Sequence, residues 1–316
     1  MERRAVLRTV MATAGAGVAA AGDAIAAQDP RGARSPAPAG AAGRASGPYV
    51  QTVDGEQLFV RDWGAGPPIV FAAAWALPSA MWDYQMAALV EQGFRCVAYD
   101  RRGHGRSSQP GTGYDYDTLA ADLHAVIESR DLRGATLVGM SMAGGEITRY
   151  LSRYGRARVS RLAYVATAAT PYRTRTADNP DGLPAEAIDA FISYQLQRDY
   201  PQWLEDNRPP FFLPDTPRPI QEWVRSLMLG HSLHALIACT RSMTRTDFRA
   251  ELGRVDVPAL VIHGTQDASA PIEVTGRPTA ALIPGARLTV YDGAPHGLFV
   301  THRDRLTADL AAFARG

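Results

Sequence analysis

The chain has 316 residues, of which 46% are hydrophobic and 21% charged, and its 33 basic residues nearly balance 32 acidic ones, giving a formal net charge of +1. This balance is typical of a globular protein, and without basic runs it gives no electrostatic signal for binding nucleic acid. Every basic residue is arginine, which excludes chemistry that needs a lysine amine, and two cysteines cannot build a four-thiolate metal site. A cofactor-free enzyme or a binding domain remains.

The first 27 residues are typical of an export signal. Paired Arg3 and Arg4 precede a weakly apolar stretch from Val10 to Gly22, and an A-x-A-like triplet follows. The arginine pair and the apolar positions after it resemble the twin-arginine pattern. The stretch is shorter than the roughly 20 residues that span a bilayer, so we expect no permanent membrane span. The alternative is a disordered, alanine-rich tail. We expect an exported protein, periplasmic or secreted, whose mature chain begins near Ala27.

Residues 28–47 are rich in Gly, Pro, Ala and Arg and have almost nothing to bury, which predicts a flexible linker. Export would place the two cysteines in an oxidising compartment. Cys96 lies in an apolar strand pattern and Cys239 in a distant helical pattern, so a bridge between them is conceivable but not favoured.

From residue 48 to the C-terminus, short apolar runs alternate with helical patterns. Strands that are apolar at nearly every position, separated by helices, predict a mostly parallel sheet covered on both faces. The first two runs are close enough to form an antiparallel hairpin. We expect strands at 49–53, 57–63, 69–75, 94–100, 135–140, 161–167, 259–264 and 287–293, and helices at 82–92, 119–130, 144–154 and 303–314.

The alternation stops after Pro171. As far as about Arg254 the chain shows only helical patterns broken by Pro-rich segments, which predicts an inserted helical cap. The cap is crowded with aromatic side chains. We expect most of them to form its core and some to line an apolar pocket above the site: Phe191, Tyr194, Tyr200, Trp203, Phe211, Phe212 and Trp223.

Ser141 lies between an apolar strand and an amphipathic helix, with Gly139 two residues before it and Ala143 two after. The G-x-S-x-[GA] pattern fits a nucleophile elbow, a sharp turn that exposes the serine oxygen and requires small neighbours. Amides at the start of the following helix favour a developing negative charge there. A serine that caps an ordinary helix would explain the pattern alone equally well.

A serine hydroxyl needs a base within hydrogen-bond reach, and that base needs an acid to orient it. His296 follows the last predicted strand, and Asp267 follows the strand at 259–264, so both belong at the edge of the sheet where Ser141 lies. The order Ser, Asp, His is that of the α/β-hydrolase fold, which we therefore predict. Asp292, four residues before His296, is the reserve candidate for the acid.

Five strings carry a family resemblance: YDRRGHGRSSQP, GTGYDYDTLAADL, GMSMAGGE, HGTQD and YDGAPHGLFVTHRDRLTADLAAF. Together they closely resemble the cofactor-free haloperoxidases, a group that overlaps the arylesterases and perhydrolases of the α/β-hydrolase superfamily. The resemblance runs from about Tyr49 to the C-terminus. It implies that Ser141, Asp267 and His296 form the catalytic triad, that the main-chain amides of Trp75 and Met142 bind the oxyanion, and that no cofactor or metal is needed.

The loop that holds Trp75 departs from the family pattern. Members of the family usually have His-Gly directly before this tryptophan and often a proline after it, whereas this chain has Ala73, Ala74 and Ala76. The missing histidine would brace the loop, and the missing glycine would supply a backbone angle that alanine dislikes. Met140 also stands before Ser141, where the family usually has histidine. Losing one oxyanion donor would slow the enzyme by roughly a hundred- to thousandfold.

Four other polar residues have plainer explanations. Asp100 and His104 lie in a Gly-rich turn, where polar side chains usually bond the backbone. His231 and His234 would share one helix face, but without a nearby acidic pattern a surface or packing role is favoured over a metal site.

The sequence therefore favours an exported serine hydrolase for small, uncharged, aromatic or short-acyl esters. A perhydrolase that forms peracids from a carboxylic acid and hydrogen peroxide is the second hypothesis, and a binding protein that kept the fold without the chemistry is the third. A dehalogenase would need a carboxylate where Ser141 stands. A small-molecule ester is the expected partner, and a homo-oligomer is left open.

Overall fold

The computed structural model describes residues 47–316. Its eight strands form one sheet in the order β1-β2-β4-β3-β5-β6-β7-β8. The strands are β1 Tyr49–Gln51, β2 Gln57–Gly64, β3 Pro68–Ala72, β4 Arg95–Tyr99, β5 Ala135–Met140, β6 Val159–Val165, β7 Ala259–Gly264 and β8 Arg287–Tyr291.

The sheet is mixed, with antiparallel pairs at one edge and parallel pairs elsewhere. β1 and β2 form the expected antiparallel hairpin, and β2 pairs antiparallel with β4. Every other pair in the sheet is parallel. Since parallel strands need crossover connections, helices lie between them and cover the sheet.

Alternate residues of each strand enter two separate apolar layers. In β3, Ile69 and Phe71 belong to the layer with α1 (Asp83–Glu91) and α12 (Arg303–Arg315). Val70 and Ala72 belong to the layer with α2 (Tyr116–Ser129) and α3 (Ala143–Tyr154). Both faces of the sheet are therefore covered, which explains why its strands are apolar at nearly every position.

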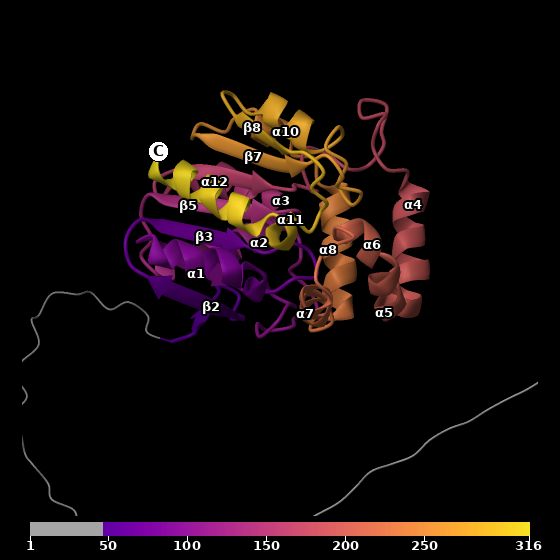
Figure 1. The fold of residues 1–316 in the computed structure, drawn as a ribbon, viewed down its shortest axis with the longest axis horizontal. Helices are drawn as coiled ribbons and strands as arrows, with labels where there is room; N and C mark the ends of the chain where they lie inside the picture. Colours follow the sequence, from indigo (N-terminus) through magenta and orange to yellow (C-terminus); the bar gives the residue numbers. More distant parts are fainter. Residues whose placement is uncertain (1–46) are drawn as a thin grey trace, which may run out of the picture. The chain divides into compact units, whose positions relative to one another are not determined.

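Between β6 and β7 the chain forms a cap of helices. Figure 1 shows the labelled helices α4 to α8 gathered beside the sheet, at the end toward which β7 points. Because β3 to β8 run parallel, this is the end where their loops carry functional side chains. The fold class, an α/β-hydrolase fold with an inserted helical cap, is confirmed. The cap contains α4 Ala185–Ala190, a π-helical turn Phe191–Leu196, α5 Gln197–Asp206, α6 Arg208–Phe211, α7 Arg218–Met228, α8 Leu233–Arg245 and α9 Arg249–Leu252.

Several element bounds differ from the sequence expectations, and three differences are the largest. β3 ends at Ala72 rather than at Trp75, because an arginine side chain, not a neighbouring strand, binds the next two carbonyl groups. α2 begins three residues earlier than expected, since the side chain of Asp115 caps it by accepting a hydrogen bond from the Thr118 N–H. Two short helices, α10 (Gly276–Leu282) and α11 (Leu298–Thr301), were not expected.

The predicted export signal, residues 1–27, lies outside the described residues, as does the predicted linker except for Gly47. Within residues 47–316, no helix is both long and apolar enough to cross a membrane. Cys96 and Cys239 are both buried as free thiols. Burial raises the pKa of each thiol to about 12, so neither is a reactive thiolate at neutral pH.

Candidate active site

Ser141 occupies a sharp turn between β5 and α3. Its φ of +56° lies in the left-handed region, which is strained for a residue with a Cβ. The turn is held by the Ser141 N–H, which donates to the Val165 carbonyl at 2.9 Å. A Cβ on Gly139 would lie 2.5 Å from the carbonyl oxygen of Ala143, so the predicted need for a small residue at this position has a direct steric cause.

Three residues far apart in the chain form one hydrogen-bonded line. His296 Nε2 lies 3.0 Å from Ser141 Oγ, and His296 Nδ1 lies 2.7 Å from Asp267 Oδ2. All three side chains are buried. The carboxylate fixes the imidazole with its proton on Nδ1, which leaves the lone pair of Nε2 facing the serine hydroxyl.

Asp267 has further partners that keep it ionised. Its Oδ1 accepts a hydrogen bond from the Ala270 N–H at 2.7 Å, and His263 Nε2 lies 3.3 Å from Oδ2. Burial alone would raise the pKa of Asp267, but the charge and hydrogen bonds of His296 and His263 hold it well below its ordinary value. The aspartate is thus an anion at neutral pH, which stabilises an imidazolium on His296.

Two main-chain amides flank this line. Trp75 follows β3, and Met142 follows the serine at the start of α3. The N–H groups of both residues donate no hydrogen bond within the part of the chain that the structure describes. The Tyr116 hydroxyl donates to the Met142 carbonyl at 3.0 Å, and the Trp75 indole donates to the Leu236 carbonyl at 3.0 Å. Each residue is therefore anchored by a hydrogen bond to another element, while its main-chain N–H remains available to a ligand.

A buried arginine braces the loop in which the family histidine is missing. Arg101 donates to the carbonyl of Ala73 at 2.5 Å and to that of Ala74 at 3.3 Å. Its Nε donates to Glu146 on α3 at 2.6 Å. One guanidinium thus joins the loop that holds Trp75 to the helix that begins beside Met142.

The strained angle in this loop lies elsewhere than expected. Ala74, which replaces the family glycine, is not among the described non-glycine residues with a positive φ, whereas Ala76 has a φ of +58°. The cost expected at Ala74 is therefore absent, and the positive φ occurs instead at Ala76, one residue after Trp75. Arg101 holds the backbone on the other side of Trp75.

Replacing Arg101 with lysine should lower kcat for p-nitrophenyl acetate by about 10- to 100-fold with a smaller change in KM. Lysine keeps a positive charge beside Glu146, but its single ammonium cannot reproduce the fork that reaches two carbonyls and a carboxylate. A misplaced Trp75 amide weakens a contact that matters mainly in the transition state. Steady-state kinetics, corrected for the folded fraction measured by thermal unfolding, provide the test. An unchanged kcat would show that Arg101 does not position the loop.

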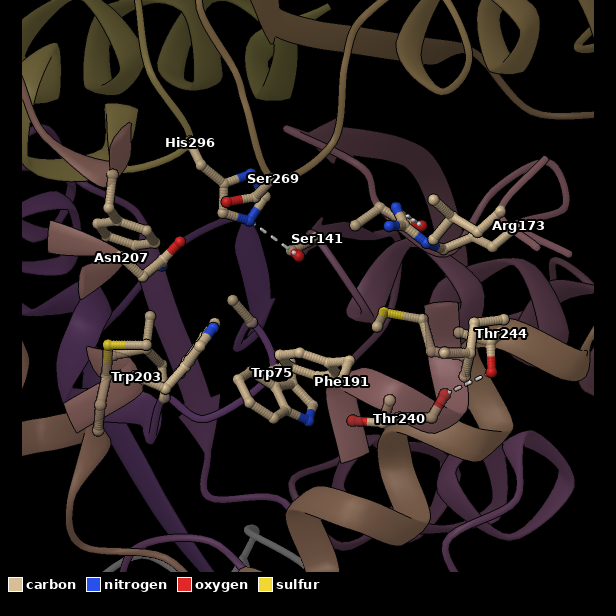
Figure 2. A pocket seen from close by; sticks show the side chains of 18 of the residues that line it. Trp75, Ser141, Arg173, Phe191, Trp203, Asn207, Thr240, Thr244, Ser269 and His296 are labelled. Atoms are coloured by element: carbon tan, nitrogen blue, oxygen red, sulfur yellow. Dashed lines mark hydrogen bonds between the residues drawn. The ribbon is translucent and has the colours of Figure 1, made fainter. Parts of the chain in front are cut away.

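A pocket of about 310 Å³ lies above Ser141. Trp75, Phe191, Trp203 and Phe211 supply its aromatic wall. Figure 2 shows the first three with Ser141 and His296 around one space. The other predicted aromatics lie elsewhere: Tyr200 and Phe212 are buried in the cap, Trp223 packs on Tyr84, and Tyr194 is 69% exposed. The pocket also contains Arg173, whose charge the expectation of an uncharged substrate did not foresee.

Asp100 and His104, for which a structural role was expected, form hydrogen bonds with the backbone and lie away from Ser141. Asp100 accepts hydrogen bonds from the N–H groups of Ser79 and Arg106. His104 Nδ1 contacts the Arg102 carbonyl.

The remaining candidates are placed in the same way. His231 accepts from the Gly105 N–H, and His234 Nε2 contacts the Gly111 carbonyl. Asp292 accepts a hydrogen bond from Thr265 rather than orienting His296. Among the described residues, no cluster of His, Cys, Asp and Glu could hold a metal ion.

Arg101, Glu146 and Arg173 were not predicted from the sequence. Two adjacent arginines in YDRRGHG were a signal, because consecutive charged side chains just after a largely apolar strand pattern need partners that the local sequence does not contain. Arg173 gave no signal, because its position in the pocket depends on how the cap folds over the sheet.

Comparison with known proteins agrees with this geometry. Residues 67–303 match the family model described as the alpha/beta hydrolase fold. The chain belongs to the alpha/beta hydrolase family.

Within the family the chain is similar to proteins with two kinds of activity in their names. A non-heme haloperoxidase of Rhodococcus erythropolis is 39% identical over 84% of this chain and 98% of its own. A bifunctional esterase/perhydrolase of Acinetobacter calcoaceticus is 38% identical over 84% of this chain and 99% of its own. Among solved structures, an esterase from Exiguobacterium antarcticum aligns with a TM-score of 0.82 at 34% identity, covering 85% of this chain and all of its own.

Proposed function

We propose that this protein is a serine hydrolase that cleaves small carboxylic esters through an acyl-enzyme. The observation that carries the proposal is the hydrogen-bonded line from Asp267 through His296 to Ser141, which ends in a largely apolar pocket. A nucleophile, its base and the group that orients the base are all within hydrogen-bond distance.

In the first half of the reaction, Ser141 Oγ attacks the ester carbonyl carbon while His296 Nε2 takes the hydroxyl proton. The carbonyl oxygen becomes an oxyanion, and the amides of Trp75 and Met142 are the donors that would bind it. The amino-terminal end of α3 adds a favourable dipole. The C–O bond of the ester then breaks, and His296 gives its proton to the leaving alcohol.

In the second half, His296 takes a proton from a water molecule that attacks the acyl group on Ser141. The tetrahedral intermediate collapses, the carboxylic acid leaves, and the proton on His296 returns to Ser141 Oγ. Asp267 stabilises the imidazolium in both halves and does not itself take the proton.

Perhydrolysis, in which hydrogen peroxide replaces that water, is the second candidate function. Its oxygen attacks the acyl carbon, a peracid leaves, and the peracid oxidises a halide in solution while it is reduced to the carboxylic acid. The names of the haloperoxidase and perhydrolase relatives favour this activity. The altered loop around Trp75, with alanine after the tryptophan, makes ester hydrolysis the activity we place first.

One assay series separates these functions. We expect hydrolysis of p-nitrophenyl acetate and covalent labelling of Ser141 by a fluorophosphonate, with weaker bromination of monochlorodimedone when acetate, peroxide and bromide are supplied. Ester cleavage without any bromination would remove the perhydrolase candidate. A protein that neither cleaves esters nor takes the label would be a binding protein with a hydrolase fold.

Export is part of the same proposal. The twin-arginine-like segment before the folded unit supports a protein that acts outside the cytoplasm, as a monomer or a homo-oligomer. Amino-terminal sequencing of the exported form should start near residue 27, and an intact Met1 on a cytosolic protein would contradict export.

A further inference from the structure

Arg173 is a charged side chain in the wall of an otherwise largely apolar pocket. It lies after β6, in the segment that enters the cap, and it lines the same space as Ser141 and His296. In Figure 2 its side chain extends toward Ser141, with the guanidinium nitrogens at that end. Nη1 donates to the Ala168 carbonyl at 2.9 Å, and the Ala168 N–H donates to the Ser141 carbonyl at 3.2 Å. The guanidinium is thereby held by Ala168, whose own amide bonds to the main chain of the nucleophile.

The charge of Arg173 has no carboxylate partner within residues 47–316. Its Nε is buried and makes no hydrogen bond, and Nη2 donates none to any described residue. A guanidinium stays protonated in proteins, so the charge cannot be removed by titration. Burial disfavours this charge and lowers the pKa of Arg173, against the opposing influence of Asp267.

Arg173 is half-buried, whereas two fully buried arginines near the site are paired. Arg101 lies 2.5 Å from Glu146, and Arg102 lies 2.7 Å from Asp122. Buried charges in proteins are normally paired in this way. Arg173 differs from them because none of the described residues that line the pocket with Ser141 is an acid. Arg173 also borders a second pocket with Asp181 and Glu273 but forms no ion pair with either of them. A carboxylate that pairs with Arg173 inside the pocket of Ser141 would therefore come with a ligand.

We propose that Arg173 binds a carboxylate carried by the substrate. The substrate class is then a short ester that also bears a free carboxylate. Examples are a half-ester of a dicarboxylic acid and a hydroxybenzoate that is acylated on its hydroxyl group. Hydrolysis adds water across the ester bond and gives the second carboxylic acid and the alcohol, with no other reactant. This inference rests on the proposed hydrolase function, and it replaces the uncharged substrate that the sequence suggested.

The aromatic wall supports a small substrate rather than a long chain. The pocket holds about 310 Å³, and Trp75, Phe191 and Trp203 cover the side away from Arg173. A ligand that reaches the guanidinium with a carboxylate therefore places the rest of its carbon chain or ring on apolar surface, with its carbonyl group near Ser141.

The test compares charged and neutral substrates of matched size. For the acyl side the pair is mono-p-nitrophenyl glutarate and p-nitrophenyl butyrate; for the alcohol side it is 4-acetoxybenzoate and its methyl ester. The measured quantity is the ratio of kcat/KM for the charged to the neutral member. We expect Arg173→Met to lower this ratio about 10- to 100-fold in at least one pair, because a charge-assisted hydrogen bond is lost.

Two variants serve as controls. Arg175→Met removes an exposed arginine two residues along the chain, whose Nε donates to the Gly182 carbonyl, and it should leave the ratio unchanged. Arg173→Lys keeps the charge without the planar fork and should retain part of the preference. Because the ratio is taken within one variant, a general loss of folded protein cancels.

An equal ratio in the wild type and in Arg173→Met, for both pairs, would overturn the proposal. If Arg173→Met does not fold, the wild type still decides, because glutarate should inhibit hydrolysis of the neutral ester more strongly than glutaramide does. Equal inhibition by both would also overturn it. Failure of the hydrolase function is a separate result, in which neither neutral nor charged ester is cleaved and Ser141 takes no fluorophosphonate.

Discussion

Replacing Ser141 with alanine is expected to reduce kcat for p-nitrophenyl acetate by about 10⁴- to 10⁶-fold, because the nucleophile that receives the acyl group is removed. KM should change little, since the pocket keeps its aromatic wall and its amides. The fold should also be retained, because the hydrogen bonds that hold this turn come from the main chain of Ser141 and not from its hydroxyl. Burst-phase kinetics and fluorophosphonate labelling measure the loss directly.

Ser226→Ala is the matched control. This serine is exposed on the cap and donates only to the nearby Trp223 carbonyl. Its replacement should leave kcat within about twofold, as for surface substitutions in general. A Ser141→Ala enzyme with wild-type turnover would show that another residue is the nucleophile, and the proposed mechanism would be wrong.

Replacing Asp267 with asparagine is expected to lower kcat by about 10³- to 10⁴-fold. The two oxygens of Asp267 accept hydrogen bonds from His296 Nδ1 and from the Ala270 N–H. An asparagine has one oxygen and one NH₂ group, so it cannot serve both donors. If the NH₂ group of the asparagine faces His296, the imidazole carries its proton on Nε2. Nε2 can then no longer accept the proton of Ser141. The kcat and the rate of fluorophosphonate labelling should fall together.

Asp292→Asn is the control for this change. Asp292 lies four residues before His296, yet its side chain accepts a hydrogen bond from Thr265. Activity within about threefold of the wild type is expected for it. If Asp292→Asn were the variant that lost activity, the acid would have been assigned to the wrong residue.

The strands and the three aligned residues could be predicted because their signals are local. Ser141, Asp267 and His296 each follow a strand with a recognisable apolar pattern, and parallel strands bring their carboxyl ends to one edge. Their convergence therefore follows from topology, and the structure brings them within hydrogen-bond distance.

The support of the site could not be predicted because it depends on partners far apart in the chain. Arg101 and Glu146 are separated by 45 residues, and their side chains meet only after β4 and α3 have packed. β3 ends early for the same reason, because Arg101 donates hydrogen bonds to the carbonyl groups that would otherwise pair with a neighbouring strand. The position of Arg173 is set by the fold of the cap, for which the sequence offered only helical periodicity.

The way the cap joins the sheet has a consequence for engineering. β6 and β7 are hydrogen-bonded neighbours, so the whole excursion of helices leaves and rejoins the sheet at adjacent points. An exchange of caps between relatives would require only two junctions, after residue 165 and before residue 259. Ser141, Asp267, His296 and the amides beside them would all remain in the recipient, so substrate preference could be transplanted without rebuilding the reacting centre.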